Sequence, residues 1–153
     1  MKRLLSSVAA VLLAVPALAV SQVKIGVINS MTGPQAPIGE NLTNGIKLAE
    51  EDLAAKGIKV QLVWEDDTGK PQVGLSAMDK LATRDNVVGV VGAYTSAVTN
   101  AVAKKAEQYK MPLVNPVASK EEITRQNYKY VFRVSATTGD YALLDRRAGS
   151  MQS

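Results

Sequence analysis

Apolar positions along the chain follow two different periods, which predicts strands interleaved with helices. Five short runs rich in β-branched, leucine or aromatic residues are of strand type: residues 23–28, 60–64, 87–91, 111–114 and 130–134. Between the first four runs, apolar residues recur at helical spacing: Leu42, Ile46, Ala49 and Leu53; Val73, Ala77 and Leu81; Val98, Val102 and Ala106. Gly57 suits the end of the first helix, and Pro71 suits the start of the second. Ser119 is predicted as the N-cap of a further helix with acidic residues in its first turn.

This alternation predicts an α/β fold, a doubly wound and mostly parallel sheet with helices on both faces. In the common strand order 2-1-3-4-5, the order reverses between strands 1 and 3, and ligands bind beyond the carboxyl ends of the strands at that point. We therefore expect a binding site in the loops at residues 29–39 and 92–97, with the loop at 115–119 beside them. All three loops are rich in hydroxyl-bearing residues, glycine or proline.

The candidate site residues lie in the second and third of these loops. Thr95 and Ser96 stand at the predicted N-terminus of the third helix, where free backbone N–H groups and the helix dipole favour an anion such as a carboxylate. The Val117 carbonyl and the Ser119 hydroxyl can accept hydrogen bonds from an ammonium group. Together the two loops would hold a zwitterion. The same spacing fits an alternative in which these hydroxyls only cap helices.

Composition narrows the chemistry further. The 153 residues suit about one domain, and they include no cysteine and no histidine. That excludes nucleophile–base pairs built on those residues and the common zinc sites. The net charge of +4 is too small and too scattered to indicate nucleic acid as a partner.

Motifs that would indicate an enzyme or a cofactor are missing. The glycines at 89 and 92 do not make the three-glycine pattern of a dinucleotide loop, and there is no phosphate-binding loop. The acidic run at residues 65–67 is interpreted as a solvated turn after an edge strand rather than a metal site. No acid–base pair or nucleophile is in place, so we predict no enzymatic activity, no cofactor and no metal.

The first 21 residues have the features of a secretory signal peptide. Lys2 and Arg3 precede an apolar run at residues 8–19, which ends in the small-residue pattern of a cleavage site, so cleavage is expected after Ala19 or Ser21. A membrane anchor would need about 20 apolar residues, more than this run provides. No cysteine follows that could carry a lipid, so we expect an exported periplasmic protein without a lipid anchor.

Three segments, residues 23–54, 64–99 and 111–124, resemble the periplasmic leucine/isoleucine/valine-binding family, the type I substrate-binding proteins of branched-chain amino acid importers driven by ATP hydrolysis. The resemblance implies a fold of two α/β lobes with the ligand between them. It implies that Thr95 and Ser96 bind the carboxylate of an amino acid, and that Val117, Ala118 and Ser119 bind its ammonium group and complete the carboxylate site. The partners it implies are a small amino acid or amide ligand and the membrane permease of an importer.

The resemblance also has two departures. Ile38 stands where several relatives that bind aliphatic amino acids carry an aromatic residue, which leaves the ligand open among amino acids, amides, urea and aromatic acids. The likeness extends to about Asp140, so residues 22–140 are expected to form an incomplete first lobe, and residues 141–153 a tail unlike the family. We expect a solute-binding protein impaired by truncation. The alternatives are a ligand-sensing receptor domain and a non-functional fragment.

Overall fold

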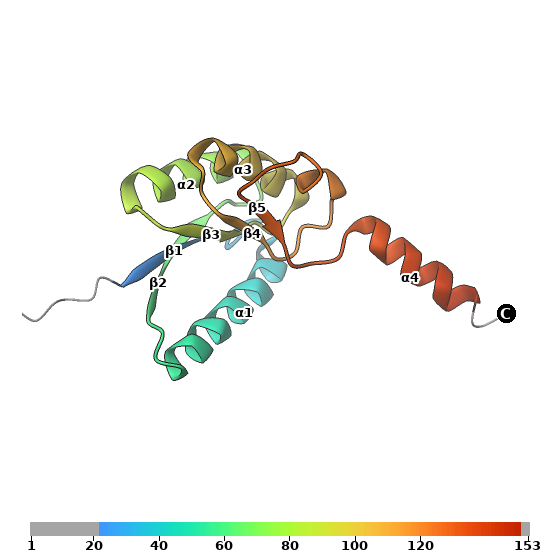
Figure 1. Cartoon of the computed structure of the whole chain (residues 1–153), viewed down its shortest axis with the longest axis horizontal. Coiled ribbons are helices and arrows are strands. Elements are labelled where there is room, and N and C mark those ends of the chain that lie inside the picture. Colours follow the sequence, from blue (N-terminus) through green and yellow to red (C-terminus); the bar gives the residue numbers. More distant parts are fainter. Residues whose placement is uncertain (1–21, 151–153) are drawn as a thin grey trace, which may run out of the picture.

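The computed structural model describes residues 22–150, and the predicted signal peptide at residues 1–21 lies outside them. Its centre is a parallel sheet of five strands: β1 (Val23–Asn29), β2 (Val60–Asp66), β3 (Gly89–Gly92), β4 (Leu113–Asn115) and β5 (Val131–Arg133). Their order is β2-β1-β3-β4-β5 (Figure 1), which confirms the strand order expected from the sequence. In the register of the sheet, Val27 of β1 pairs with Trp64 on one side and with Val91 on the other.

Helices cover both faces of the sheet, as predicted for a doubly wound fold. The helices are α1 (Ala36–Ala55), α2 (Pro71–Lys80), which continues into a π-helical turn at Leu81–Asp85, α3 (Ser96–Tyr109) and α4 (Thr138–Ser150). Figure 1 shows α2 and α3 on one face and α1 on the other, with α4 pointing away from the sheet. No helix within residues 22–150 has the length and apolar character needed to cross a bilayer.

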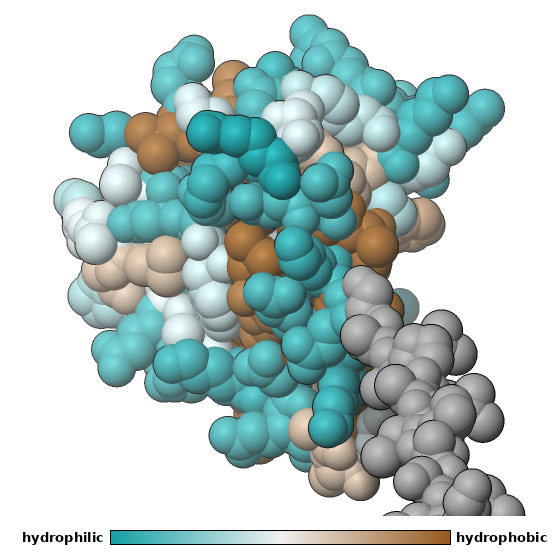
Figure 2. Space-filling model, turned by 90° about the vertical axis from the view of Figure 1, so that its left-hand side faces the viewer, coloured by the Kyte–Doolittle hydropathy of each residue, from teal (hydrophilic) through white to brown (hydrophobic). Residues whose placement is uncertain are grey.

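The hydrophobic core lies mainly on the face covered by α2 and α3. Fully buried apolar side chains come from the sheet and from both helices: Ile28, Met78, Leu81, Val90, Val98, Val102 and Leu113. On the opposite face, Gly39 is the buried residue of α1, and Leu48 on that helix is 60% exposed. Apolar patches also reach the surface at the end of the molecule where β1 begins (Figure 2), where Val23 and Val88 are about half exposed.

Two predicted elements differ from the structure. The first helix begins at Ala36, six residues before the first apolar position of its predicted spacing, because Pro37 fits its first turn. Ser119 is not a helix N-cap, so that prediction is wrong. The segment after it forms only a 3₁₀ turn at Glu121–Ile123, and Lys120 precedes this turn without a side-chain cap. Hydrogen bonds from later residues to the backbone carbonyls of this segment hold it in place instead.

Candidate functional site

The loops that follow β1, β3 and β4 meet at the carboxyl edge of the sheet and line an open pocket of about 280 Å³. Its lining consists of Gln35, Tyr94, Thr95, Ser96, Val117, Ala118 and Ser119. The structure therefore brings together all five candidate residues of the sequence analysis. Gln35 and Tyr94 were not among them. Only their positions in the sequence could have indicated that they line the pocket. Gln35 precedes the first helix in the first predicted loop, and Tyr94 adjoins Thr95.

One wall of the pocket is the N-terminus of α3. Thr95 has extended backbone angles, φ −79° and ψ 142°, and its hydroxyl accepts a hydrogen bond of 3.3 Å from the Val98 amide. Thr95 is therefore the N-cap, which decides between the two hydroxyls that the spacing left open. Ser96 is the first residue of the helix, half-buried, with its hydroxyl free of the capping role. The free N–H groups of this first turn are donors for an anion.

The opposite wall is held by Asn115, whose side chain is fully buried at the end of β4. Its amide nitrogen donates to the Ala118 carbonyl at 2.8 Å, and its oxygen accepts from the amides of Val117, at 3.2 Å, and Ala118, at 2.9 Å. These three bonds fold residues 115–118 into a turn over the end of the strand. Ser119 follows the turn, and its carbonyl accepts a 3.0 Å hydrogen bond from the Thr138 amide at the start of α4.

A second buried asparagine positions the rim of the pocket near Gln35. Asn29, at the end of β1, donates to the Gly39 carbonyl at 2.7 Å and to the Thr43 hydroxyl at 3.0 Å. Its side-chain oxygen accepts from the Ser30 amide at 2.9 Å. The first turns of α1 are thereby fixed against the end of the central strand. As a result the N-termini of both α1 and α3 lie at this edge of the sheet.

The electrostatics of the pocket rest on dipoles rather than on charges, because its seven lining residues include no Asp, Glu, Lys, Arg or His. Helix N-termini supply donors, while carbonyl and hydroxyl oxygens supply acceptors. Such a set matches a ligand that carries both an anionic and a cationic group. Within the described residues, no group of three or more acidic, histidine or cysteine side chains gathers to hold a metal ion.

An apolar groove adjoins the polar pocket. Its volume is about 480 Å³, and it shares Tyr94 and Val117 with the pocket. The other lining residues come mainly from one face of α1: Ile38, Asn41, Leu42, Gly45, Ile46 and Ala49, with Pro116 opposite. Ile38, the position singled out in the sequence, is thus at the apolar side of the pocket and is 46% exposed.

The acidic run at residues 65–67, at the end of β2, differs from its interpretation as a solvated turn. Asp67 is fully buried and accepts a 2.6 Å hydrogen bond from the Ser30 hydroxyl. Asp66 accepts hydrogen bonds from the amides of Met31, at 2.9 Å, and Thr68, at 2.8 Å, and from the Thr32 hydroxyl, at 2.5 Å. Both carboxylates therefore fix the loop after β1. The sequence did not show this, because the partners in that loop lie more than thirty residues away.

These hydrogen bonds make stability depend on pH. Partial burial would raise the pKa of Asp66, but the Thr32 hydroxyl and the surrounding amides outweigh it and hold the pKa below the ordinary 3.8. A lowered folded-state pKa stabilises the fold above the unfolded-state pKa, and this stabilisation is lost as the pH falls through the folded-state pKa. We expect Asp66→Asn to lower the unfolding free energy by about 1 kcal/mol at pH 7. Urea unfolding at a series of pH values should show the difference in unfolding free energy between wild type and variant disappear as the pH falls through the folded-state pKa of Asp66. A difference independent of pH would contradict the assignment.

The chain is similar in sequence to known proteins. The sequence profile of the family described as periplasmic binding protein matches residues 22–149. The Leu/Ile/Val-binding protein homolog 3 of Brucella melitensis is 33% identical over an alignment of 145 residues, which covers 92% of this chain and 39% of that protein. The boundary predicted at Asp140 falls inside α4, and the assignment of residues 141–153 to a separate tail stays a prediction.

Two solved structures share the fold. The leucine-binding protein LivK from Thermotoga maritima is 32% identical with a TM-score of 0.70, over 75% of this chain and 33% of that one. A solute-binding protein of an ABC transporter from Rhodopseudomonas palustris, solved with 3,4-dihydroxybenzoic acid, is 30% identical with a TM-score of 0.70, over 76% of this chain and 32% of that one. The chain thus spans between about a third and two fifths of the length of these proteins.

Proposed function

Because the chain belongs to the periplasmic binding protein family, we propose that its pocket at the carboxyl edge of the sheet binds a small amino acid, branched-chain or related, for delivery to an ATP-driven importer. The observation that carries the proposal is the meeting of five candidate residues from two separate loops in one pocket that no acidic or basic side chain lines. The family is one of binding proteins, which confirms the prediction that the chain is not an enzyme.

The ligand's two charged groups have separate partners in this proposal. Its carboxylate lies at the N-terminus of α3, near the Ser96 hydroxyl and the free amides of the first turn. Its ammonium group faces the loop after β4, where the Val117 carbonyl and the Ser119 hydroxyl accept hydrogen bonds. The Thr95 hydroxyl contributes chiefly by capping α3, which keeps the first turn open toward the ligand.

The ligand's side chain has an apolar surface beside it. The groove along α1 joins the pocket at Tyr94 and Val117, and Ile38 lies on it. This favours an aliphatic or aromatic substituent over a polar one, because removing apolar surface from water is favourable by about 25 cal/mol per Å². One related solved structure is that of a leucine-binding protein and another holds 3,4-dihydroxybenzoic acid, so relatives with this fold accept both kinds of ligand.

Residues 22–150 by themselves contact such a ligand from one side. The two-lobed arrangement implied by the family resemblance would cover the other side, and the lost contacts lower affinity tenfold for each 1.4 kcal/mol. We therefore expect binding by this chain alone to be weak, in the millimolar range. Periplasmic location and a permease partner belong to the same proposal, and their support is the family and the signal-like features of residues 1–21.

Two adjacent hydroxyls provide the test of this function. We expect Ser96→Ala to weaken binding of L-leucine about tenfold while changing the unfolding free energy by less than about 0.5 kcal/mol. Thr95→Ala should instead lower the unfolding free energy by about 1 kcal/mol, since it removes the N-cap. Titrations followed by NMR give the affinities, and urea unfolding gives the stabilities.

The matched control is Ser76→Ala on α2, an exposed serine whose hydroxyl bonds within its own helix. It should change neither affinity nor, beyond a few tenths of a kcal/mol, stability. If Ser96→Ala leaves L-leucine binding intact, the carboxylate does not lie at the start of α3. If no amino acid of the branched-chain class binds at all, the fragment alternative is favoured.

A further inference from the structure

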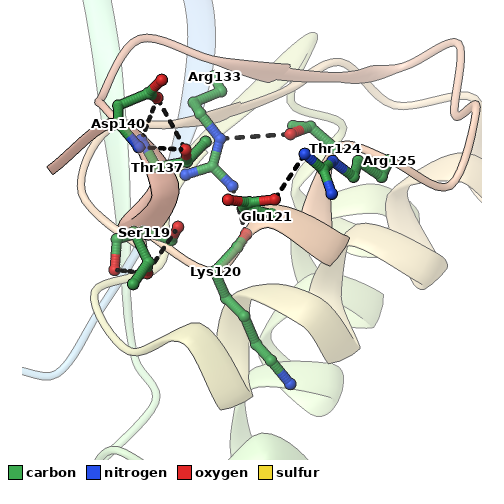
Figure 3. Close-up of polar contacts among 9 residues, drawn as sticks. Ser119, Lys120, Glu121, Thr124, Arg125, Arg133, Thr137 and Asp140 are labelled. Carbon is green, nitrogen blue, oxygen red and sulfur yellow. Dashed lines mark hydrogen bonds and ion pairs between the residues drawn. The ribbon is translucent and has the colours of Figure 1, made fainter. Parts of the chain in front are cut away.

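Arg133, the last residue of β5, holds the loop that forms the ammonium side of the pocket. Its Nη1 donates to the Ala118 carbonyl, its Nη2 donates to the Lys120 carbonyl at 2.6 Å, and its Nε donates to the Thr124 hydroxyl at 3.3 Å. Figure 3 shows the guanidinium group lying between the 3₁₀ turn and the segment that carries Ser119. Arg133 is partly buried and does not line the pocket.

The carbonyl groups of this segment point in alternating directions as a result. Those of Ala118 and Lys120 turn toward Arg133, while that of Ser119, between them, accepts from the Thr138 amide at 3.0 Å. Ala118 receives a second hydrogen bond, of 2.8 Å, from Asn115. The Ala118 oxygen therefore accepts two hydrogen bonds within the protein. The acceptors left to face a ligand are the Val117 carbonyl and the Ser119 hydroxyl.

We propose that Arg133 is a positioning residue for the amino acid pocket, fixing residues 118–120 so that the neighbouring acceptors meet the ligand's ammonium group. This inference rests on the proposed function. The positioning role needs the planar fork of a guanidinium, because the carbonyls of Ala118 and Lys120 receive hydrogen bonds from two different nitrogens of one side chain. A lysine keeps the charge but offers a single nitrogen.

The test compares two ligands that differ only in the ammonium group, L-leucine and 4-methylpentanoate. Arg133→Lys keeps the positive charge and removes the fork. We expect this variant to weaken L-leucine binding at least fivefold more than 4-methylpentanoate binding, as followed by NMR titration of the chain. A role in general stability would lower the two affinities alike.

Two further variants complete the design. Arg125→Lys is the matched control, because Arg125 lies in the same region, pairs with Glu121 and has a side chain 76% exposed. It should leave both affinities unchanged. Thr124→Val removes the acceptor of Nε while leaving Arg133 in place, and should shift the ratio in the same direction by about twofold. This milder change keeps the test decisive if Arg133→Lys does not fold.

Each outcome decides one question. A selective loss for L-leucine supports the positioning role. An equal loss for both ligands, or no loss for either, overturns it while the proposed function stands. Wild-type protein that binds neither ligand, or binds both equally, contradicts the proposed function itself, and the inference falls with it.

Discussion

Replacing Gly39 by alanine is expected to lower the unfolding free energy by about 3 kcal/mol, which is large for the addition of one methyl group. Gly39 is buried in the first turns of α1, where an added Cβ would collide with the backbone carbonyl of Ser30 and lie 2.9 Å from its carbon. The helix would have to move off the loop after β1, which would also strain the hydrogen bond between Asn29 and the Gly39 carbonyl. Urea unfolding followed by circular dichroism measures the loss.

The same helix supplies the control. At Gly45 an added Cβ meets nothing within 4 Å, so Gly45→Ala should raise the unfolding free energy by up to about 1 kcal/mol through helix propensity. Opposite signs for one substitution at two positions of α1 are the expected pattern. Equal effects at both positions would contradict the close approach of α1 to β1.

The second large effect is expected at Asn115. Asn115→Ala removes three hydrogen bonds and leaves the amides of Val117 and Ala118 without their acceptor. An unsatisfied buried group costs about 1–3 kcal/mol, so we expect a loss of about 3 kcal/mol in unfolding free energy. L-leucine affinity should fall as well, because the turn that carries the ammonium side of the pocket loses its anchor.

Asn100→Ala tests whether this effect is specific. Asn100 is exposed on α3, where alanine is the better helix former, so the change should be neutral or slightly stabilising. Asn115→Asp separates the two halves of the amide, since a carboxylate can still accept from both backbone N–H groups but cannot donate to Ala118. Full retention of stability in Asn115→Ala would contradict the anchoring role of this side chain.

The local pattern of apolar and polar residues was sufficient to predict the sheet and the edge of the sheet at which the pocket lies. Strand-type runs and intervening helical spacing determine a parallel sheet, and its usual strand order brings residues 95–96 and 117–119 to the same edge. The exact strand limits were shifted, as in β3, which begins at Gly89 rather than at Val87. Hydrogen-bonded pairing decides those limits, and apolar character alone does not record it.

Long-range polar contacts were beyond the reach of the sequence. Asp66 accepts from the Met31 amide 35 residues away, and Arg133 donates to the Lys120 carbonyl 13 residues away, and neither separation has a signature in the local pattern. Thr95 and Ser96 could not be told apart as caps from spacing, since only the backbone angles decide which residue precedes the helix. The acidic residues after Ser119 favour a helix cap at this position, yet contacts of Thr138 with Ser119 and of Arg133 with Lys120 determine the path of this segment.

The apolar stripe of α1 illustrates a different limit. Helical spacing correctly identified a helix with an apolar face, yet Ile46 and Ala49 on that face line an open groove rather than a closed core. Periodicity shows which side of a helix avoids water, but it does not show what covers that side. The groove is therefore defined by the structure, and its role beside the pocket is part of the proposed function.

The most direct test of the central claim is a residue-resolved NMR titration of the chain with L-leucine. The account predicts saturable shifts of the amides of Ser96, Ala97, Ala118 and Ser119, all with one dissociation constant in the millimolar range. The two halves of the pocket would then respond to a single ligand. Shifts confined to one loop, shifts that do not saturate, or no shifts at these amides would contradict the claim that the two loops form one amino acid site.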